Sequence, residues 1–262
     1  MPTVRHLGQH SALPDHYDRS LLEAIPRQSS IDGVGYDVWH AYEATALRND
    51  GVAINGVLKL TYEAESDYII ESKSLKLYLY SLANTHLGDT TEQVQMAYEL
   101  ITKEDISRCL GWGVECCFFT EISTYESVLD GYKLLEKSRP FRPNKDRTLK
   151  VATHGLATLC PVTGQPDWGT LMLQITGDQL PTREDLFQLL RDLRGKPEFH
   201  EDVANRLYEH FQERYEPISL LVACLYTRRG GIDICPVRYS FVDLEPLLLT
   251  DTTLLSMPTF RR

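Results

Sequence analysis

The sequence of 262 residues predicts an α+β protein made of two similar halves. In each half, strand-like runs accompany segments with apolar residues at helical spacing. Residues 136–149 separate the halves, since they contain two prolines and many charges and show no apolar period. We therefore expect two antiparallel sheets, each with helices on one face, in domains 1–140 and 141–262.

The first half opens with an irregular arm, followed by predicted strands at residues 52–62 and 67–80. The second of these is predicted because leucines occupy every other position from 75 to 79. A helix follows, with Asp89 as its N-cap and Glu92 three residues later, as in a capping box. The buried stripe expected on this helix consists of Val94, Ala97, Tyr98 and Ile101. The next predicted strand comprises residues 114–122.

The second half repeats this alternation of strands and helices. Thr182 and Asp185 predict the start of a helix that ends at Gly195, and Pro197 is expected to open a second helix. The second helix has an apolar residue at every fourth position: Phe199, Val203, Leu207 and Phe211. The predicted strands are residues 150–159, 170–175, 218–227 and 232–242, the last two forming a hairpin.

Composition narrows the class of protein. The chain is 42% hydrophobic and 24% charged with a net charge of -10, which is typical of a globular protein and argues against extended contact with nucleic acid phosphates. No stretch is apolar enough to span a bilayer, and residues 1–11 have no signal-peptide pattern. The six cysteines include no C-x-x-C pair, so we expect a reduced, cytoplasmic protein. His6 and His10 lack further ligands nearby, and no metal site is predicted.

Cys160 is the first candidate for chemistry. It lies in residues 159–169, a run with two prolines and two glycines that predicts a shaped loop, and Asp167 follows seven residues later. An ionised thiol is a nucleophile, and a nearby carboxylic acid can protonate the group that the thiol attacks. The alternative is a buried structural cysteine followed by a turn aspartate.

A second candidate is the pair His200 and Glu201 at the predicted start of a helix. A carboxylate there can accept hydrogen bonds from the N–H edge of a purine-like base. The alternative is an acid in the first helical turn that interacts favourably with the helix dipole.

Two basic segments predict an anion site. Residues 71–78, ESKSLKLY, could form a strand in which Lys73 and the serines hold phosphate while Glu71 holds another polar group; the alternative is a solvated edge strand. Residues 228–231, RRGG, offer an arginine fork, or simply a hairpin turn. Together they suit a ligand with two phosphate sites, such as a dinucleotide. The chain has no G-x-G-x-x-G and no Walker loop.

These four motifs resemble the QueF family, the NADPH-dependent 7-cyano-7-deazaguanine reductases of queuosine biosynthesis, a tRNA modification. The octet at 71–78, the Cys160 loop, the triplet Phe199-His200-Glu201 and the RRGG turn occur in the family's order and spacing. The resemblance covers nearly the whole chain and is to the long form with two modules. It implies tandem tunnelling-fold (T-fold) modules and a homodimer.

The resemblance also implies an activity. Such an enzyme reduces a nitrile to 7-aminomethyl-7-deazaguanine with two NADPH, through a thioimide on Cys160, with Asp167 as proton donor. It further implies which residues bind each ligand. The substrate residues would be Ile70, Glu71, Ser72, His200 and Glu201, and the NADPH residues would be Ser72, Lys73, Arg229 and Gly230. The partner would be a small molecule, with no direct contact to nucleic acid or membrane.

Two other functions stay open from the sequence. An amidinotransferase-like relative would form the same thioimide but transfer nitrogen, a step that needs no NADPH. A non-catalytic T-fold protein would bind a purine or pterin without using Cys160 and Asp167.

Overall fold

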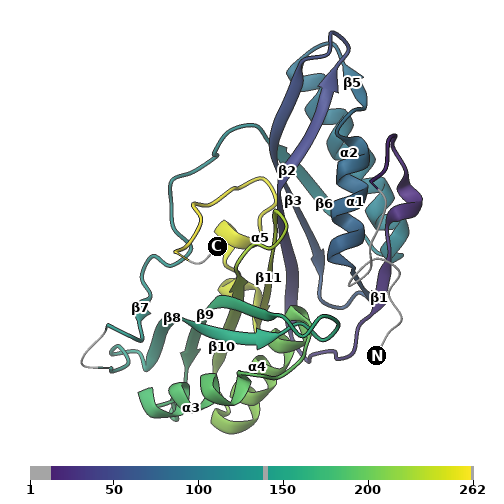
Figure 1. Cartoon of the computed structure of the whole chain (residues 1–262). Coiled ribbons are helices and arrows are strands. Elements are labelled where there is room, and N and C mark those ends of the chain that lie inside the picture. Colours follow the sequence, from purple (N-terminus) through teal and green to yellow (C-terminus); the bar gives the residue numbers. More distant parts are fainter. Residues whose placement is uncertain (1–12, 138–140, 261–262) are drawn as a thin grey trace.

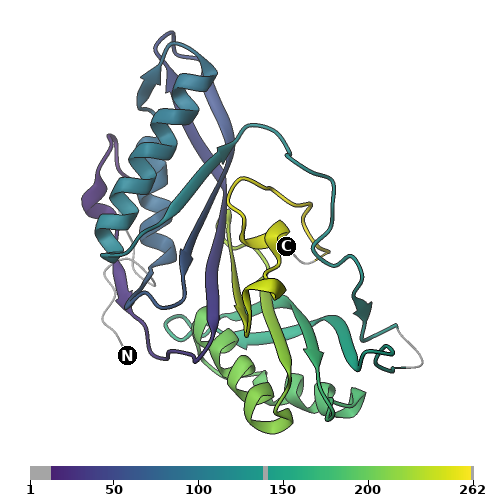
Figure 2. The ribbon, with the colours of Figure 1, turned by 180° about the vertical axis from the view of Figure 1, so that it is seen from behind.

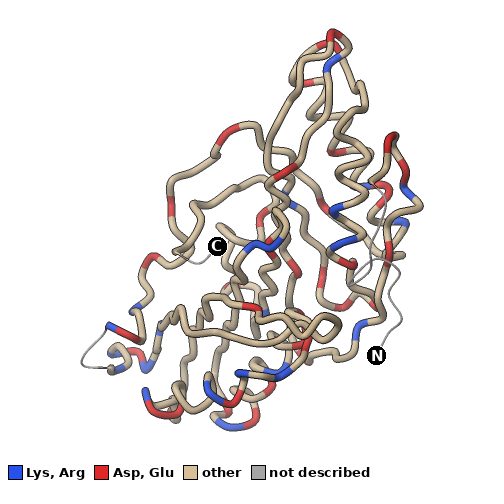
Figure 3. Tube along the Cα trace, viewed as in Figure 1, with Lys and Arg blue, Asp and Glu red and all other residues tan. Residues whose placement is uncertain are grey.

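The computed structural model of the protein describes residues 13–137 and 141–260 (Figure 1). The predictions for residues 1–11, including His6 and His10, lie outside the described residues. No helix within the described ranges is long and apolar enough to cross a membrane. Acidic and basic residues are scattered over both halves, as the coloured trace in Figure 3 shows.

The first half contains a short arm, one long hairpin and two helices. In chain order its elements are η1 (Arg19–Leu21), β1 (Ala24–Pro26), β2 (Val34–Arg48), β3 (Ala53–Glu63), β4 (Tyr68–Ile70), α1 (Ser72–Leu82), β5 (His86–Gly88), α2 (Thr91–Leu110) and β6 (Glu115–Phe119). Helices α1 and α2 pack on one face of the β2–β3–β6 sheet, and their apolar residues form one core with it (Figure 1).

The second half has the same plan with different lengths. Its elements are β7 (Lys133–Leu134), β8 (Thr148–Leu159), β9 (Pro166–Thr176), α3 (Arg183–Leu193), α4 (His200–Tyr215), β10 (Ser219–Tyr226), β11 (Ile232–Tyr239), η2 (Val242–Leu244) and α5 (Leu247–Thr250). Helices α3 and α4 cover one face of its strands and close a second core. The predicted α+β class, with antiparallel sheets and helices on one face, is confirmed.

The expectation of a separate sheet in each half is wrong, because one sheet runs through both halves. Its strand order is β6-β3-β2-β11-β10-β9-β8-β7, with β5 paired to β2, so that nine of the described strands form a single sheet. The join is the antiparallel pairing of β2 with β11, which extends from Ile232 opposite Ala41 to Tyr239 opposite Val34. Figure 2 shows this join from behind, with the two helical layers at opposite ends of the sheet. The predicted boundary at residue 140 stays a prediction.

The C-terminal segment covers the face of the join that the helices leave open. Leu249 is fully buried in a third core cluster together with residues of β9, β10 and β11. The Lys59 ammonium group on β3 donates to the carbonyl oxygens of Asp251 and Leu254, both at 2.7 Å. The join is therefore covered on both faces.

The predicted strand at residues 67–80 is wrong beyond its first residues. Only β4 is extended, and α1 begins at Ser72 because the Glu71 side chain accepts hydrogen bonds from the backbone N–H groups of Lys73 and Ser74, both at 2.7 Å. The residues buried on α1 include a set at helical spacing: Leu75, Tyr78, Leu79 and Leu82. The alternation of leucines also fits a helix that is buried on more than one side.

One strand was missed, and three further expectations need correction. The sequence did not predict the 15-residue strand β2, because this strand is buried along nearly its whole length and shows no clean alternation. Thr90, not Asp89, caps α2, since its side chain accepts from the N–H of Gln93. Helix α4 begins at His200 and not at Pro197. Strand β9 begins at Pro166, so Asp167 lies in a strand and not in the loop. The Thr182–Asp185 capping box is confirmed.

A substitution at Gly56 would test the close packing of β3 against β6. A Cβ atom at Gly56 would collide with the carbonyl oxygen of Phe119 and lie 2.8 Å from the Phe118 ring. We expect Gly56→Ala to lower the free energy of unfolding by about 1–3 kcal/mol, the usual range for overpacking. Gly113→Ala is the control, because a Cβ there meets no atom within 4 Å. Equal denaturant midpoints for the two variants would contradict this packing.

Candidate active site

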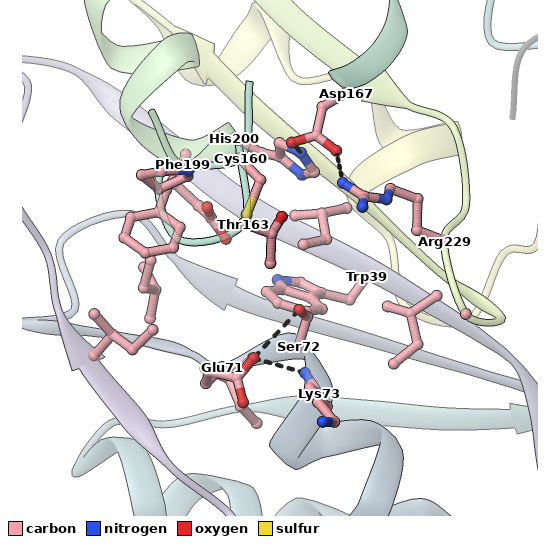
Figure 4. Close-up of a pocket in the computed structure, with 18 of the residues that line it drawn as sticks. Trp39, Glu71, Ser72, Lys73, Cys160, Thr163, Asp167, Phe199, His200 and Arg229 are labelled. Carbon is pink, nitrogen blue, oxygen red and sulfur yellow. Dashed lines mark hydrogen bonds and ion pairs between the residues drawn. The ribbon is translucent and has the colours of Figure 1, made fainter. Parts of the chain in front are cut away.

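A cavity of about 250 Å³ lies where the two halves meet. Its wall contains every residue that the family resemblance assigns to catalysis or binding: Ile70, Glu71, Ser72, Lys73, Cys160, Asp167, His200, Glu201, Arg229 and Gly230. Figure 4 shows the two groups on opposite sides, with Glu71, Ser72 and Lys73 facing Cys160, Asp167, His200 and Arg229. The first half supplies one wall, and the second half supplies the other.

Cys160 is held at the tight turn between β8 and β9. Its N–H donates to the carbonyl of Gln165 at 2.8 Å, and its own carbonyl accepts from the N–H of Gly164 at 3.0 Å. Gly164 has a φ of 66°, a left-handed conformation that glycine adopts without strain. The turn leaves the Cys160 side chain at the cavity wall, although the residue is only 9% exposed.

Asp167 lies between an imidazole and a guanidinium. Its Oδ2 is 3.3 Å from Nε2 of His200, and its Oδ1 accepts from Nη1 of Arg229 (Figure 4). Burial would raise the pKa of Asp167, but the hydrogen bonds and charges of His200 and Arg229 outweigh burial and lower it below the ordinary carboxyl value. Asp167 is therefore a carboxylate at neutral pH when no ligand is bound.

The start of α4 is tied to the end of β8. The N–H of Leu159 donates to the carbonyl of Lys196, and the N–H of Glu198 donates back to the carbonyl of Leu159, both at 3.0 Å. These bonds hold the residues just before α4 beside Cys160. The His200 ring then stacks on Tyr226, with centroids 3.6 Å apart and planes 10° apart.

Glu201 is a buried acid with an incomplete set of partners. The residue is 2% exposed, and its Oε1 has no hydrogen-bond partner among the described residues. Burial, and then the nearby charge of Asp37, raise the pKa of Glu201 to about 8. An acceptor oxygen that is buried without a donor is suited to an N–H group of a ligand.

The segment at 71–78 contributes a helix start in place of the predicted strand. Glu71 is 1% exposed and caps α1, and the Ser72 hydroxyl lies 3.4 Å from its Oε1. The N–H of Glu71 donates to the carbonyl of Glu23, so the N-terminal arm fixes this wall. Lys73 lies at the cavity in the first turn of α1.

The RRGG turn reaches across to the first half. Gly230 and Gly231 have φ values of 57° and 82°, as a tight hairpin requires. Nζ of Lys76 on α1 donates to the Gly230 carbonyl at 2.7 Å. The Arg229 guanidinium donates to the Asp167 carboxylate and to the side-chain oxygen of Gln165.

Sequence reasoning missed part of the cavity wall. Trp39 and Ile234 come from the paired strands β2 and β11, and Ile25 and Ile69 come from β1 and β4. Only the long-range pairing of β2 with β11 brings Trp39 to the site, and no local motif marks it. Thr227, just after β10, also lines the cavity and was not singled out.

A cluster that could hold a metal lies outside the cavity wall. Within the described ranges, His40, Asp233 and Cys235 place three ligand atoms within 4.8 Å of one another. These residues already bond to each other, since His40 Nδ1 lies 2.7 Å from Asp233 Oδ1 and the Cys235 thiol donates to the same oxygen at 3.5 Å. The cluster joins β2 to β11 and is not part of the cavity.

The arrangement combines three chemical capacities. A thiol beside a carboxylate that contacts an imidazole can add to an electrophilic carbon and move a proton. The Glu201 oxygen can accept from the N–H edge of a base. Three cationic side chains on the wall, Lys73, Lys76 and Arg229, can neutralise phosphate groups.

Comparisons with known proteins agree with these capacities. A family model described as nitrile reductase, 7-cyano-7-deazaguanine-reductase N-term, matches residues 13–118, and one described as QueF-like protein matches residues 166–241. The NADPH-dependent 7-cyano-7-deazaguanine reductase of Acidovorax ebreus is 35% identical, with 94% of this chain and 96% of the relative covered. The enzyme of the same name from Teredinibacter turnerae is 33% identical, with 89% and 90% covered.

One solved structure is also similar, an apo form of the archaeosine synthase QueF-Like. It is 17% identical with a TM-score of 0.35, and the match covers 37% of this chain and 96% of that chain. This weak likeness supports none of the conclusions about the site.

The buried Glu201 should make the stability of the fold depend on pH in a specific range. The folded chain holds the Glu201 proton more tightly than the unfolded chain, because the pKa rises from 4.5 to about 8 on folding. Its contribution to stability is therefore complete below 4.5 and is lost as pH rises towards 8. Each pH unit in this window should cost up to about 1.4 kcal/mol.

We expect Glu201→Gln to remove the loss of stability that ionisation of Glu201 causes as pH rises, because the amide stays neutral at every pH. The measurement is the free energy of unfolding of both proteins in urea at several pH values from 4.5 to 8. Glu209→Gln, an exposed position on the same helix, is the matched control and should follow the wild type. If the free energies of unfolding of wild type and Glu201→Gln differed by the same amount at every pH from 4.5 to 8, the raised pKa of Glu201 would be refuted.

Proposed function

The chain belongs to the QueF family of NADPH-dependent 7-cyano-7-deazaguanine reductases, and we propose that Cys160 and Asp167 carry out its nitrile reduction. The protein is an oxidoreductase that reduces a nitrile at the expense of NADPH. The observation that supports the proposed roles most directly is that one cavity collects the thiol, the carboxylate and the unpartnered Glu201 oxygen, the last judged over the described residues.

The first step is addition of the Cys160 thiol to the nitrile carbon. A C–S bond forms, one of the three C–N bonds is lost, and the product is a thioimide. The thiol proton must end on the nitrogen, so the step balances without an outside proton. Asp167 is a carboxylate in the ligand-free site and can take this proton and pass it to the nitrogen. His200 orients the carboxylate from its other side.

The base is proposed to bind between His200–Glu201 and the start of α1. Glu201 accepts from ring or amino N–H groups, and two such donors favour its ionised form. Ile70 is 2% exposed and contributes an apolar surface to the wall. Glu71 and Ser72 contribute the polar groups of the opposite wall.

The residues present fit a dinucleotide phosphate. Lys73 and Arg229 provide positive charge on the cavity wall. The Ser72 hydroxyl and the Gly230 backbone N–H beside them provide hydrogen-bond donors. Two NADPH molecules bound in turn would each supply one hydride, and together these would take the nitrile to the amine. Arg229 contacts Asp167 in the ligand-free chain, so its proposed contact with NADPH requires this pair to open.

Four earlier expectations stay proposals. The homodimer and the free-base substrate, without direct contact to nucleic acid, are proposed from the family resemblance. The cytoplasmic location is proposed because all six cysteines are free thiols. The place of the reaction in queuosine biosynthesis is proposed on the same resemblance.

The decisive experiment is intact mass with 7-cyano-7-deazaguanine in the absence of NADPH. We expect an adduct equal to the mass of the nitrile, because thiol addition loses no atoms. Cys160→Ala should give no adduct, whereas Cys117→Ala, which removes a partly buried thiol on β6, should keep it. Wild type should then oxidise two NADPH per nitrile. Turnover without any adduct on Cys160 would overturn the covalent mechanism.

Asp167→Asn tests the proton transfer. An amide cannot carry the proton, so we expect kcat to fall by about 10²- to 10⁴-fold, the usual contribution of general acid–base catalysis. The nitrile should still bind, measured as Kd by calorimetry with Cys160→Ala present in both proteins to prevent trapping. Asp192→Asn on the exposed side of α3 is the control. An unchanged kcat together with a weaker Kd would assign Asp167 to binding alone.

A further inference from the structure

Trp39 has a buried N–H group that the reaction described above does not use. The residue lies in β2, is 1% exposed, and has its backbone paired with Leu60 on one side and Ile234 on the other. Its Nε1 is buried and has no hydrogen-bond partner within residues 13–137 and 141–260. The indole lines the cavity, and Figure 4 shows it between the wall of Cys160 and Arg229 and the wall of Glu71 and Ser72.

An unpartnered indole N–H is an unusual feature in a core. Buried polar groups nearly always have a partner, and the indole nitrogen is a donor only. A phenylalanine would fill much of the same space without an unpaired N–H. Trp39 lines the cavity, and Figure 4 shows its indole between the two walls, so a ligand in the cavity can bring an acceptor to the indole.

We propose that the indole N–H of Trp39 donates a hydrogen bond to a carbonyl oxygen of a bound ligand and so contributes to substrate selection. The identity of the ligand rests on the proposed function. The 6-oxo group of the deazaguanine is such an acceptor, and so is the carboxamide of the nicotinamide ring. Both ligands present the same chemistry to Trp39, and the two can be told apart by measurement.

The unpartnered atoms of the cavity support this assignment. In the part of the chain that the structure describes, the unpartnered buried atoms of the cavity residues include Glu201 Oε1, an acceptor, and Trp39 Nε1, a donor, beside His200 Nδ1 and Thr227 Oγ1. A guanine-type ring carries N–H donors and a carbonyl acceptor on one edge, so it can satisfy both kinds of atom. A site that bonds a polar group of its substrate strongly rejects analogues that lack the group.

The first experiment measures binding, with Cys160→Ala as the background so that no covalent adduct forms. Trp39→Phe removes the N–H and keeps an aromatic ring. We expect Kd for one ligand, the nitrile or NADPH, to rise about 10-fold, as expected for loss of one neutral hydrogen bond. Kd for the other ligand should stay the same. Trp112→Phe, a partly buried tryptophan of the same core outside the cavity wall, is the matched control.

The second experiment removes the acceptor. The 6-deoxo analogue of the nitrile lacks the carbonyl, and it also lacks the N1 proton, so the informative quantity is the comparison between proteins. If the nitrile is the partner, wild-type Trp39 should discriminate between the two nitriles about 10-fold more than Trp39→Phe does. If NADPH is the partner, this discrimination should be equal in both proteins, and only Kd for NADPH should change.

Two outcomes would overturn the proposal. Trp39→Phe could bind both ligands as tightly as the control does. It could also bind both ligands equally more weakly while its denaturation midpoint falls, which would show a role in packing only.

Turnover of the wild type is measured in parallel. If the wild type forms no adduct and oxidises no NADPH, the proposed function fails, and this result is distinct from any effect of Trp39.

Discussion

The buried carboxylate of Asp37 is the interaction on which the architecture and the site both depend. Asp37 is fully buried on β2 and accepts from Arg27 of the N-terminal arm at 2.7 Å and from Arg238 of β11 at 2.8 Å. Arg238 in turn donates to Asn205 of α4 at 2.5 Å. Buried ion pairs add little net stability, but loss of one partner leaves an unpaired charge, so they fix which elements meet. The same charge of Asp37 helps to keep Glu201 protonated.

The two halves divide the work of the site. The second half holds the groups proposed to react, since Cys160 and Asp167 lie on one hairpin and His200 and Glu201 begin one helix. The first half supplies the opposite wall through the start of α1 and the floor through Trp39. The Lys76–Gly230 hydrogen bond spans the gap between them. Neither half contains a complete cavity, so the relative position of the halves decides the geometry of the reaction.

The sequence predicted the residues of the site better than the elements that carry them. Cys160 could be singled out from the sequence because its loop composition and its spacing to Asp167 are short-range features. The segment at Glu71 was predicted as a strand because its leucines alternate. A glutamate is not among the preferred N-cap residues, so it did not mark the start of α1, although here its side chain accepts from the N–H groups of Lys73 and Ser74. Trp39 could not be predicted, since its strand is buried almost throughout and its partner strand β11 lies near the other end of the chain.

The pairing of β2 with β11 also sets the order in which the molecule can assemble. His40 and Asp233 meet across this pairing although 193 positions separate them, and closing so long a loop is slow compared with local contacts. The cores of the two halves are separate clusters and can form earlier. During synthesis β11 leaves the ribosome after the other strands of the sheet, because among the described residues it is the last of them in chain order. The surroundings of Cys160 are therefore completed only after β11 has been made.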